Sequence, residues 1–265
     1  MKIKSVLSVI LFLGMFVFLN PLQAEDKTVK LPAKEKFHIY LLIGQSNMAG
    51  RGKVTAAENQ PHPRVLKLDE QGKWVPATDP LHFDKPKIAG VGPGSGFGPM
   101  MADADPDVTI GLIPAAFGGT PLSRWVKGKD LYERAVEWAK KNQDRGVVKG
   151  AIWHQGEAEC KNPDLYNTYQ KRLSGMIVDL RTDLNEPDLP FVMGELGEFL
   201  ERPGVSTVND AMHKISKSVP ATAVASSKGL AAKSDQVHFN AKSEREFGKR
   251  YAQQMLKLQK AAKTK

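Results

Sequence analysis

The chain has 265 residues and a formal net charge of +9 at pH 7. Its single cysteine, Cys160, excludes an intramolecular disulfide and a cysteine-rich structural zinc site. Much of the basic excess lies in residues 249–265, where no nucleic-acid-binding motif accompanies it. The charge therefore predicts a solvated helix face and tail, with attraction to an acidic polysaccharide as the alternative and no nucleic-acid partner.

The first 24 residues have the layout of a secretory signal. Two lysines precede an apolar run over residues 5–19, and the small Ala24 stands just before a charged stretch. We expect cleavage after Ala24, export as a secreted or periplasmic protein, and a single domain over residues 25–265. The alternative is an uncleaved anchor, but the apolar run is shorter than the roughly 20 residues that cross a bilayer. Stable membrane insertion of the mature chain is not expected.

Short β-rich runs then alternate with helical patterns, which is typical of a parallel sheet covered on both faces. Strands are expected over residues 37–43, 108–113, 147–153, 190–196 and 221–225. A small hairpin over 65–75 is appended to the first strand, and a long ordered loop over 76–99 follows it. Helices are expected over residues 131–140, 165–180, 206–219 and 247–258, and the apolar stripes of the second and the fourth are expected to face the core.

Candidate chemical residues come directly after strands of this pattern. They are Ser46, Gly118, Gln155 and His238. In an open parallel sheet, ligands bind at the carboxyl ends of the strands. We therefore expect these four residues to meet at one edge of the sheet.

Ser46 lies in the segment Gly44-Gln45-Ser46-Asn47-Met48, where the backbone must turn sharply as the first strand ends. Gly44 flanks the serine, and Asn47 and Gly50 tolerate the unusual backbone angles of such a turn. The segment is compatible with an exposed nucleophile and equally with a serine that caps a helix. It is not an α/β-hydrolase elbow, because Met48 occupies the second glycine position of that motif.

Asp235 and His238 stand three residues apart just before the terminal helix. A serine hydroxyl needs a base to remove its proton, and the base needs a third group to hold its tautomer. These two residues could supply both, or they could be a surface carboxylate and a packing histidine. His154 lies near the same sheet edge, but nothing in the sequence identifies its partner. No histidine spacing indicates a metal site, and no metal or organic cofactor is expected.

Hydrolysis of an ester also needs hydrogen-bond donors for the oxyanion that forms on the carbonyl oxygen. The segment 116–120 offers backbone N–H groups around Gly118 and Gly119, and the segment 153–157 offers the amide of Gln155. Read without a function, these are a turn and a loop amide.

Taken together, these segments resemble the SGNH hydrolase superfamily, and most closely its sialate O-acetylesterase-like branch with the family six carbohydrate esterases (acetyl xylan esterase-like). The resemblance runs from about Phe37 to Tyr251. It rests mainly on residues 44–48, 118–120, 153–157 and 235–239, with 96–98 and 194–196 as further matching segments. It implies an α/β fold, a three-layer α/β/α sandwich with a central, mostly parallel five-stranded sheet.

The resemblance also implies roles for individual residues. Ser46 would be the nucleophile and His238 the base, while Gly118 and Gln155 would join the Ser46 N–H as oxyanion donors. Gln155 stands where the wider superfamily carries an asparagine. The glutamine side chain is longer, so the direction of its amide is less fixed by the resemblance than that of the asparagine. Asp235 is the favoured acid because it is close to His238 along the chain, and Glu157 is the alternative.

The function predicted is a serine esterase that removes O-acetyl groups from carbohydrates, such as acetylated xylan or sialic acid. The alternatives are a carbohydrate-binding protein of the same fold without turnover and a short-chain lipid or aryl esterase. Arg51 could bind substrate or form a structural ion pair. Trp74 and Trp125 could stack on a sugar, with packing in the core as the alternative.

Overall fold

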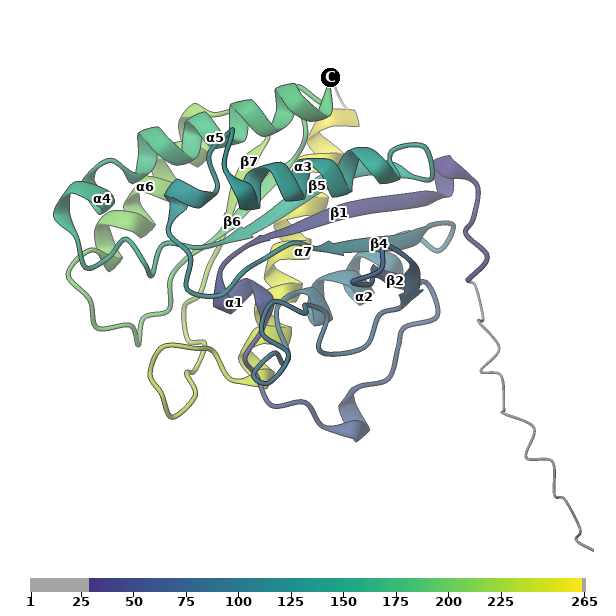
Figure 1. Cartoon of the computed structure of the whole chain (residues 1–265), viewed down its shortest axis with the longest axis horizontal. Coiled ribbons are helices and arrows are strands. Elements are labelled where there is room, and N and C mark those ends of the chain that lie inside the picture. Colours follow the sequence, from purple (N-terminus) through teal and green to yellow (C-terminus); the bar gives the residue numbers. More distant parts are fainter. Residues whose placement is uncertain (1–28, 264–265) are drawn as a thin grey trace, which may run out of the picture.

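The computed structural model describes residues 29–263, so the expected signal segment over residues 1–24 lies outside the described residues. A single seven-stranded sheet forms the middle of the molecule, with helices on both faces (Figure 1). The α/β sandwich expected from the sequence is therefore confirmed. In the described part of the chain no helix is both long and apolar enough to cross a membrane.

The sheet has the strand order β3-β2-β4-β1-β5-β6-β7. Its strands are β1 (Phe37–Gly44), β2 (Val65–Leu68), β3 (Trp74–Pro76), β4 (Thr109–Pro114), β5 (Val147–His154), β6 (Phe191–Gly194) and β7 (Thr222–Ala225). All neighbours pair in parallel except β2 and β3. The expected number of five strands is wrong because the hairpin is not an appendage: β2 pairs with β4 and extends the same sheet.

The central strand β1 shows why the sheet is covered on both sides. Phe37, Ile39 and Leu41 enter one apolar core, whereas Tyr40 and Leu42 enter the other. Successive side chains of a strand point to opposite faces, so an unbroken apolar run needs a layer of helices on each face.

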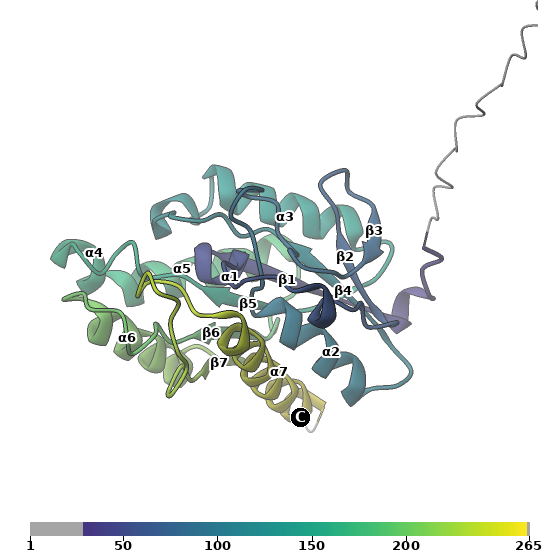
Figure 2. The same ribbon diagram turned by 90° about the horizontal axis from the view of Figure 1, so that it is seen from below.

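The first of these cores lies under α3 (Asp130–Asn142), α5 (Tyr169–Leu184) and α6 (Val205–Ser218), and the second under α2 (Gly94–Ala104) and α7 (Ala241–Lys263). Figure 2 shows α2 and α7 side by side on the second face. Two short helices, α1 (Ser46–Ala49) and α4 (Pro163–Asn167), and the 3-10 turns Lys34–Lys36, Ala56–Glu58 and Leu122–Arg124 complete the structure.

Helix α2 occupies the end of the segment that was expected to be a long loop over residues 76–99. Its glycines and Pro99 lower its intrinsic helix propensity, which is why the sequence pattern favours a loop. The structure uses one of these glycines for close packing, because a Cβ on Gly96 would lie 1.9 Å from the carbonyl oxygen of Arg245 in α7. Tertiary packing against α7 therefore outweighs propensity.

Helix α5 also starts later than expected, since the helical pattern over residues 165–180 divides into α4 and α5 at Thr168. The two tryptophans considered as sugar-stacking walls belong to the first core. Trp74 is 5% exposed and Trp125 is 1% exposed. Both therefore pack inside the protein.

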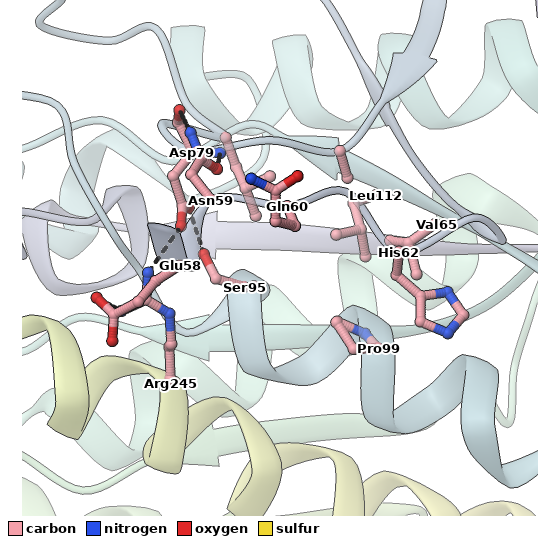
Figure 3. A pocket seen from close by; sticks show the side chains of 13 residues that line it. Glu58, Asn59, Gln60, His62, Val65, Asp79, Ser95, Pro99, Leu112 and Arg245 are labelled. Carbon is pink, nitrogen blue, oxygen red and sulfur yellow. Dashed lines mark hydrogen bonds and ion pairs between the residues drawn. The ribbon is translucent and has the colours of Figure 1, made fainter. Parts of the chain in front are cut away.

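A small hollow of about 40 Å³ lies between the remaining loop, α2 and α7 (Figure 3). Inside it, the Ser95 hydroxyl donates a hydrogen bond to Asp79, and Arg245 Nη2 lies 3.6 Å from Asp79 Oδ2. Burial raises the pKa of Asp79, although Ser95 and Arg245 act in the opposite direction. These contacts tie the loop to both helices and so hold its continuation near the carboxyl edge of the sheet.

Candidate active site

Ser46 is placed by the turn that ends β1. Gly44 has a φ of +130°, and a Cβ on it would lie 2.1 Å from the carbonyl oxygen of His154. The Gln45 N–H donates to that same oxygen at 2.8 Å, so the first residues after β1 are fixed against the end of β5. Ser46 then begins α1, and Gln45, not Ser46, is the residue at the cap position. The serine is therefore not a helix cap.

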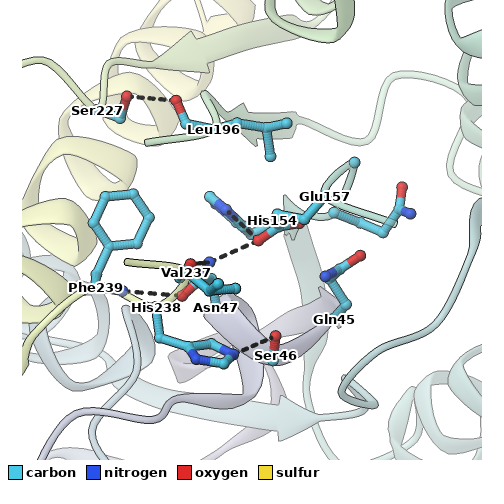
Figure 4. Close-up of polar contacts among 12 residues, drawn as sticks. Gln45, Ser46, Asn47, His154, Glu157, Leu196, Ser227, Val237, His238 and Phe239 are labelled. Atoms are coloured by element: carbon cyan, nitrogen blue, oxygen red, sulfur yellow. Dashed lines mark hydrogen bonds and ion pairs between the residues drawn. The ribbon is translucent and has the colours of Figure 1, made fainter. Parts of the chain in front are cut away.

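The side chains of Ser46, His238 and Asp235 form a continuous hydrogen-bonded chain. Ser46 Oγ lies 3.0 Å from His238 Nε2, as Figure 4 shows. His238 Nδ1 lies 2.9 Å from Asp235 Oδ2. Because the carboxylate only accepts, Nδ1–H donates to it and Nε2 is left to accept the serine proton. This is the geometry of a serine nucleophile with an oriented base.

Asp235 is itself held by the loop that carries His238. Its Oδ1 accepts hydrogen bonds at 2.9 Å from the backbone N–H of Val237 and from that of His238. Burial alone would raise the pKa of Asp235, but these bonds and the bond from the His238 ring lower it far below its ordinary value. Asp235 is therefore an ionised partner for the imidazole.

Glu157, the alternative acid, lies elsewhere. Its Oε1 accepts a hydrogen bond of 2.6 Å from Asn47 Nδ2 and lies 3.4 Å from His154 Nε2 (Figure 4). It makes no hydrogen bond or ion pair with His238 within residues 29–263. Of the two carboxylates, only Asp235 contacts the base.

Gly118 lies beside the serine, but its N–H already donates a hydrogen bond within the protein and is not available to an oxyanion. It donates at 2.8 Å to Oδ2 of Asp84, a loop residue that the sequence analysis missed. Arg51 Nη2 lies 2.7 Å from the same oxygen, and the two side chains are 3% and 1% exposed. Burial would raise the pKa of Asp84, but hydrogen bonds from Arg51 and Gly118 lower it. Arg51 thus forms the structural ion pair.

Gln155 is fully buried, and its amide nitrogen is already used. Nε2 donates to the carbonyl oxygen of Thr120 at 3.2 Å and also to the carboxylate of Glu159. The two predicted oxyanion donors other than the Ser46 N–H, Gly118 and Gln155, are therefore both bound to carboxylates. Within the described residues, the N–H groups of Ser46 and Gly119 make no hydrogen bond.

A pocket of about 360 Å³ opens over this site. Its lining includes Ser46 and His238 together with the basic residues Lys85, Lys161 and Arg202. None of these three bases forms an ion pair with a residue in the described part of the chain. Glu157 is the one acidic residue in the lining, and it is 2% exposed. The entrance therefore carries positive charge that the protein does not neutralise.

Residues 36–257 match the model of a family described as carbohydrate esterase, sialic acid-specific acetylesterase. The chain belongs to this carbohydrate esterase family. It is therefore a carboxylic ester hydrolase, as the sequence predicts. The sialate O-acetylesterase-like resemblance is likewise confirmed.

Two comparisons link the esterase to one plant protein. It is 31% identical to a probable carbohydrate esterase of Arabidopsis thaliana over 240 residues, which cover 82% of this chain and 90% of the relative. The X-ray structure of the Arabidopsis protein matches with a TM-score of 0.77 and 30% identity, over 83% of this chain and 98% of that one.

More distant structures share the fold. NanS matches with a TM-score of 0.68 and 16% identity, over 87% of this chain and all of that one. A carbohydrate acetylesterase from Xanthomonas citri matches with a TM-score of 0.66 and 21% identity, over 84% of this chain and 56% of that one. In residues 29–263 of the esterase, no three His, Cys, Asp or Glu side chains gather as a metal site would require.

The close packing around Gly118 gives a testable prediction for the esterase. A Cβ at this position would lie 2.3 Å from Arg51 Nη2 and 3.4 Å from the Ser46 Cβ. We expect Gly118→Ala to move the Arg51 side chain and the nucleophile loop, and to lower kcat/KM by about a hundredfold, as misplaced catalytic groups do. Steady-state hydrolysis of a chromogenic acetate ester measures this.

Gly175 in α5 is the matched control, because a Cβ there meets nothing within 4 Å. Gly175→Ala should keep wild-type activity and stabilise the helix by about 0.5–1 kcal/mol. Wild-type kcat/KM for Gly118→Ala would show that the fit of Arg51 against this glycine has no part in catalysis.

Proposed function

We propose that this esterase removes O-acetyl groups from carbohydrates through an acetyl-serine intermediate. The observation that carries the proposal is the chain of contacts from Ser46 through His238 to Asp235, of which Ser46 and His238 line a pocket. Membership in a carbohydrate esterase family supports the sugar as the alcohol part of the ester.

The first half of the reaction forms the intermediate. His238 Nε2 takes the proton of Ser46 as Oγ attacks the acetyl carbonyl carbon, and Asp235 stabilises the imidazolium that results. The tetrahedral oxyanion accepts a hydrogen bond from the Ser46 N–H, which donates to no other group among residues 29–263. The C–O bond to the sugar then breaks, and the sugar oxygen leaves with the proton from His238.

The second half returns the enzyme to its starting state. His238 takes a proton from water as the water oxygen attacks the acetyl carbon, and Ser46 Oγ leaves and recovers that proton. Acetate is released. We propose Gly118 N–H and the Gln155 amide as further oxyanion donors, which requires that Asp84 and Glu159 release them when substrate binds.

The charge at the pocket entrance narrows the choice of sugar. Lys85, Lys161 and Arg202 line the pocket, and their charge favours acetylated sugars that carry a carboxylate, such as sialic acid, over neutral acetylated xylan. Acetate release should therefore be faster from O-acetylated sialic acid than from acetylated xylan chains without acidic substituents. The preference should fall as salt rises from about 0.01 to 1 M, because salt screens exposed charges.

The double variant Lys85→Ala, Lys161→Ala should lower that preference about fivefold, which corresponds to the small free energy of exposed charge pairs. Lys171 on α5 is the matched control, because it is exposed and does not line the pocket. Faster release from neutral xylan at every salt concentration would reject the anionic substrate and leave the esterase activity standing.

We also propose that the protein is secreted or periplasmic, on the strength of the signal-like residues 1–24. Expression in a bacterial host with its own export machinery should yield a mature protein that begins at Glu25. Edman sequencing of the exported protein checks this, and a chain that retains its first 24 residues would contradict it.

A further inference from the structure

Asn47, the residue after the nucleophile, contacts the loop of His238 on both sides of the histidine. Its Nδ2 donates to the carbonyl oxygen of Val237 at 3.1 Å, and its Oδ1 accepts from the N–H of Phe239 at 3.2 Å (Figure 4). Asn47 is 2% exposed, so water does not compete for these bonds. The Asn47 side chain therefore fixes the backbone on both sides of His238 relative to Ser46.

These two bonds require one orientation of the amide, because a carbonyl oxygen only accepts and a backbone N–H only donates. Glu157 enforces this orientation. Its Oε1 is a second acceptor for Asn47 Nδ2, at 2.6 Å, and a carboxylate so placed would repel the amide oxygen. Hydrogen bonds to a charged partner are about twice as strong as neutral ones. Glu157 thus holds Asn47 in the orientation that the His238 loop needs.

His154 lies beside Glu157 in the interior, where both side chains are almost fully buried. Tyr251 O–H donates to the carbonyl oxygen of Trp153 at 2.9 Å, so the phenol oxygen is free to accept from His154 Nδ1–H at 3.1 Å. The other ring nitrogen, Nε2, then faces Glu157 Oε1 at 3.4 Å. Burial would raise the pKa of Glu157, but the neighbouring His154 ring and the hydrogen bond from Asn47 lower it.

The loop that receives these contacts lies at the surface. The side chains of His238 and Asp235 are 23% and 39% exposed. Asp235 binds both the ring and the backbone N–H of His238 within this one loop. The acid and the base therefore move together, and the contact that depends on an anchor outside the loop is the one between His238 and Ser46.

We propose that Asn47, held in orientation by Glu157 and His154, is a positioning residue that sets the distance between His238 and Ser46. The proposal rests on the proposed function, since it assigns a role within the same hydrolysis. It gives Glu157 a role other than that of the triad acid. The carboxylate fixes an amide, and the amide fixes the loop of the base.

Asn47→Ala tests this role directly. Without the amide, His238 stays paired with Asp235 but is no longer held at the right distance from Ser46. We therefore expect kcat for a chromogenic acetate ester to fall about tenfold to a hundredfold. KM should stay within about twofold, since Asn47 does not line the pocket. The pH at which activity is half lost on the acid side should not move, because the Asp235–His238 pair is intact.

Glu157→Gln provides a second variant in case Asn47→Ala does not fold. Its amide oxygen can still accept from Asn47 but carries no full charge, so kcat should fall by less than in Asn47→Ala, again without a shift of the pH profile. The double variant should be no slower than Asn47→Ala alone, because Glu157 acts through Asn47. If the losses of kcat in the two single variants added fully in the double variant, Glu157 would not act through Asn47.

Asn142 supplies the control for a loss of stability alone. It is a 5% exposed amide at the end of α3, where Oδ1 accepts from Trp74 Nε1 and Nδ2 donates to the carbonyl oxygen of Trp138. Asn142→Ala should destabilise the fold yet keep wild-type kcat. Equal losses of kcat in both alanine variants, or full activity in Asn47→Ala, would overturn the positioning role while leaving the proposed function intact. A wild-type protein without activity on any acetate ester would instead reject the function.

Discussion

Ser46→Ala should abolish ester hydrolysis, with kcat reduced on the order of 10⁴-fold or more, because the alcohol that attacks the acetyl carbon is removed. Stability should change little. The variant loses one hydrogen bond, to His238, and a net hydrogen bond contributes about 1 kcal/mol. Hydrolysis of a chromogenic acetate ester, together with the urea midpoint of unfolding, measures both effects.

Ser216 provides the matched serine. Its hydroxyl bonds the carbonyl oxygen of His213 on the exposed side of α6, and it does not line the pocket. Ser216→Ala should keep wild-type activity. If Ser46→Ala retained wild-type kcat with the fold intact, the nucleophile would have to be another group.

Asp235→Asn should have the second largest effect, a fall in kcat on the order of 10³ to 10⁴-fold. The carboxylate holds Nδ1–H toward itself, so that Nε2 faces Ser46 as a base. An amide in its place can donate to Nδ1 and favour the wrong tautomer, and it cannot stabilise an imidazolium. Steady-state kinetics of Asp235→Asn beside Glu157→Gln measures the difference, and we expect Asp235→Asn to be by far the slower.

The pH profile adds an independent check on this assignment. The pKa of Asp235 lies below its ordinary value in the folded protein, so Asp235 stays ionised as the pH falls into the mildly acidic range. The wild-type rate should therefore fall on the acid side of the pH–rate profile with the uptake of one proton. Asp235→Asn should shift this acid side of the profile, because the base has lost its anionic partner. If Glu157→Gln shifted the acid side of the pH–rate profile and Asp235→Asn did not, Glu157 would be the triad acid.

The contacts among Ser46, His238 and Asp235 were predictable because they follow from local motifs and one topological rule. Ser46 follows a buried strand, and Asp235 stands three residues from His238, so the short spacing already favours Asp235 as the partner of the histidine. Parallel strands deliver their carboxyl ends to one edge of the sheet. The contact between Ser46 and His238, which are 192 residues apart, follows from that rule.

The partners of the predicted oxyanion donors could not be read from the sequence. Asp84 reaches Gly118 from a loop with no motif of its own, and that loop contacts α2 and α7 through Asp79. Glu159 takes the Gln155 amide because both side chains are buried in one place, which no local pattern encodes. Helix α2 was missed for a related reason, since glycines that disfavour an isolated helix allow close packing.

The motif around Ser46 includes Asn47, but the sequence does not predict the contacts of Asn47 with the loop of His238. From the sequence, Asn47 is expected only to tolerate the backbone angles of the turn after the first strand. The structure adds these contacts, because the amide bonds the backbone of Val237 and of Phe239. Only the folded chain brings these residues together.

The most direct test of the proposed mechanism is to stop the reaction with an acetate ester in acid within milliseconds and to analyse the digested protein by mass spectrometry. We expect the peptide that contains Ser46 to carry one acetyl group, to lose it as the substrate is exhausted, and never to gain it in Ser46→Ala. Rapid hydrolysis with no acetyl group on that peptide, or an acetyl group on a different residue, would contradict the mechanism.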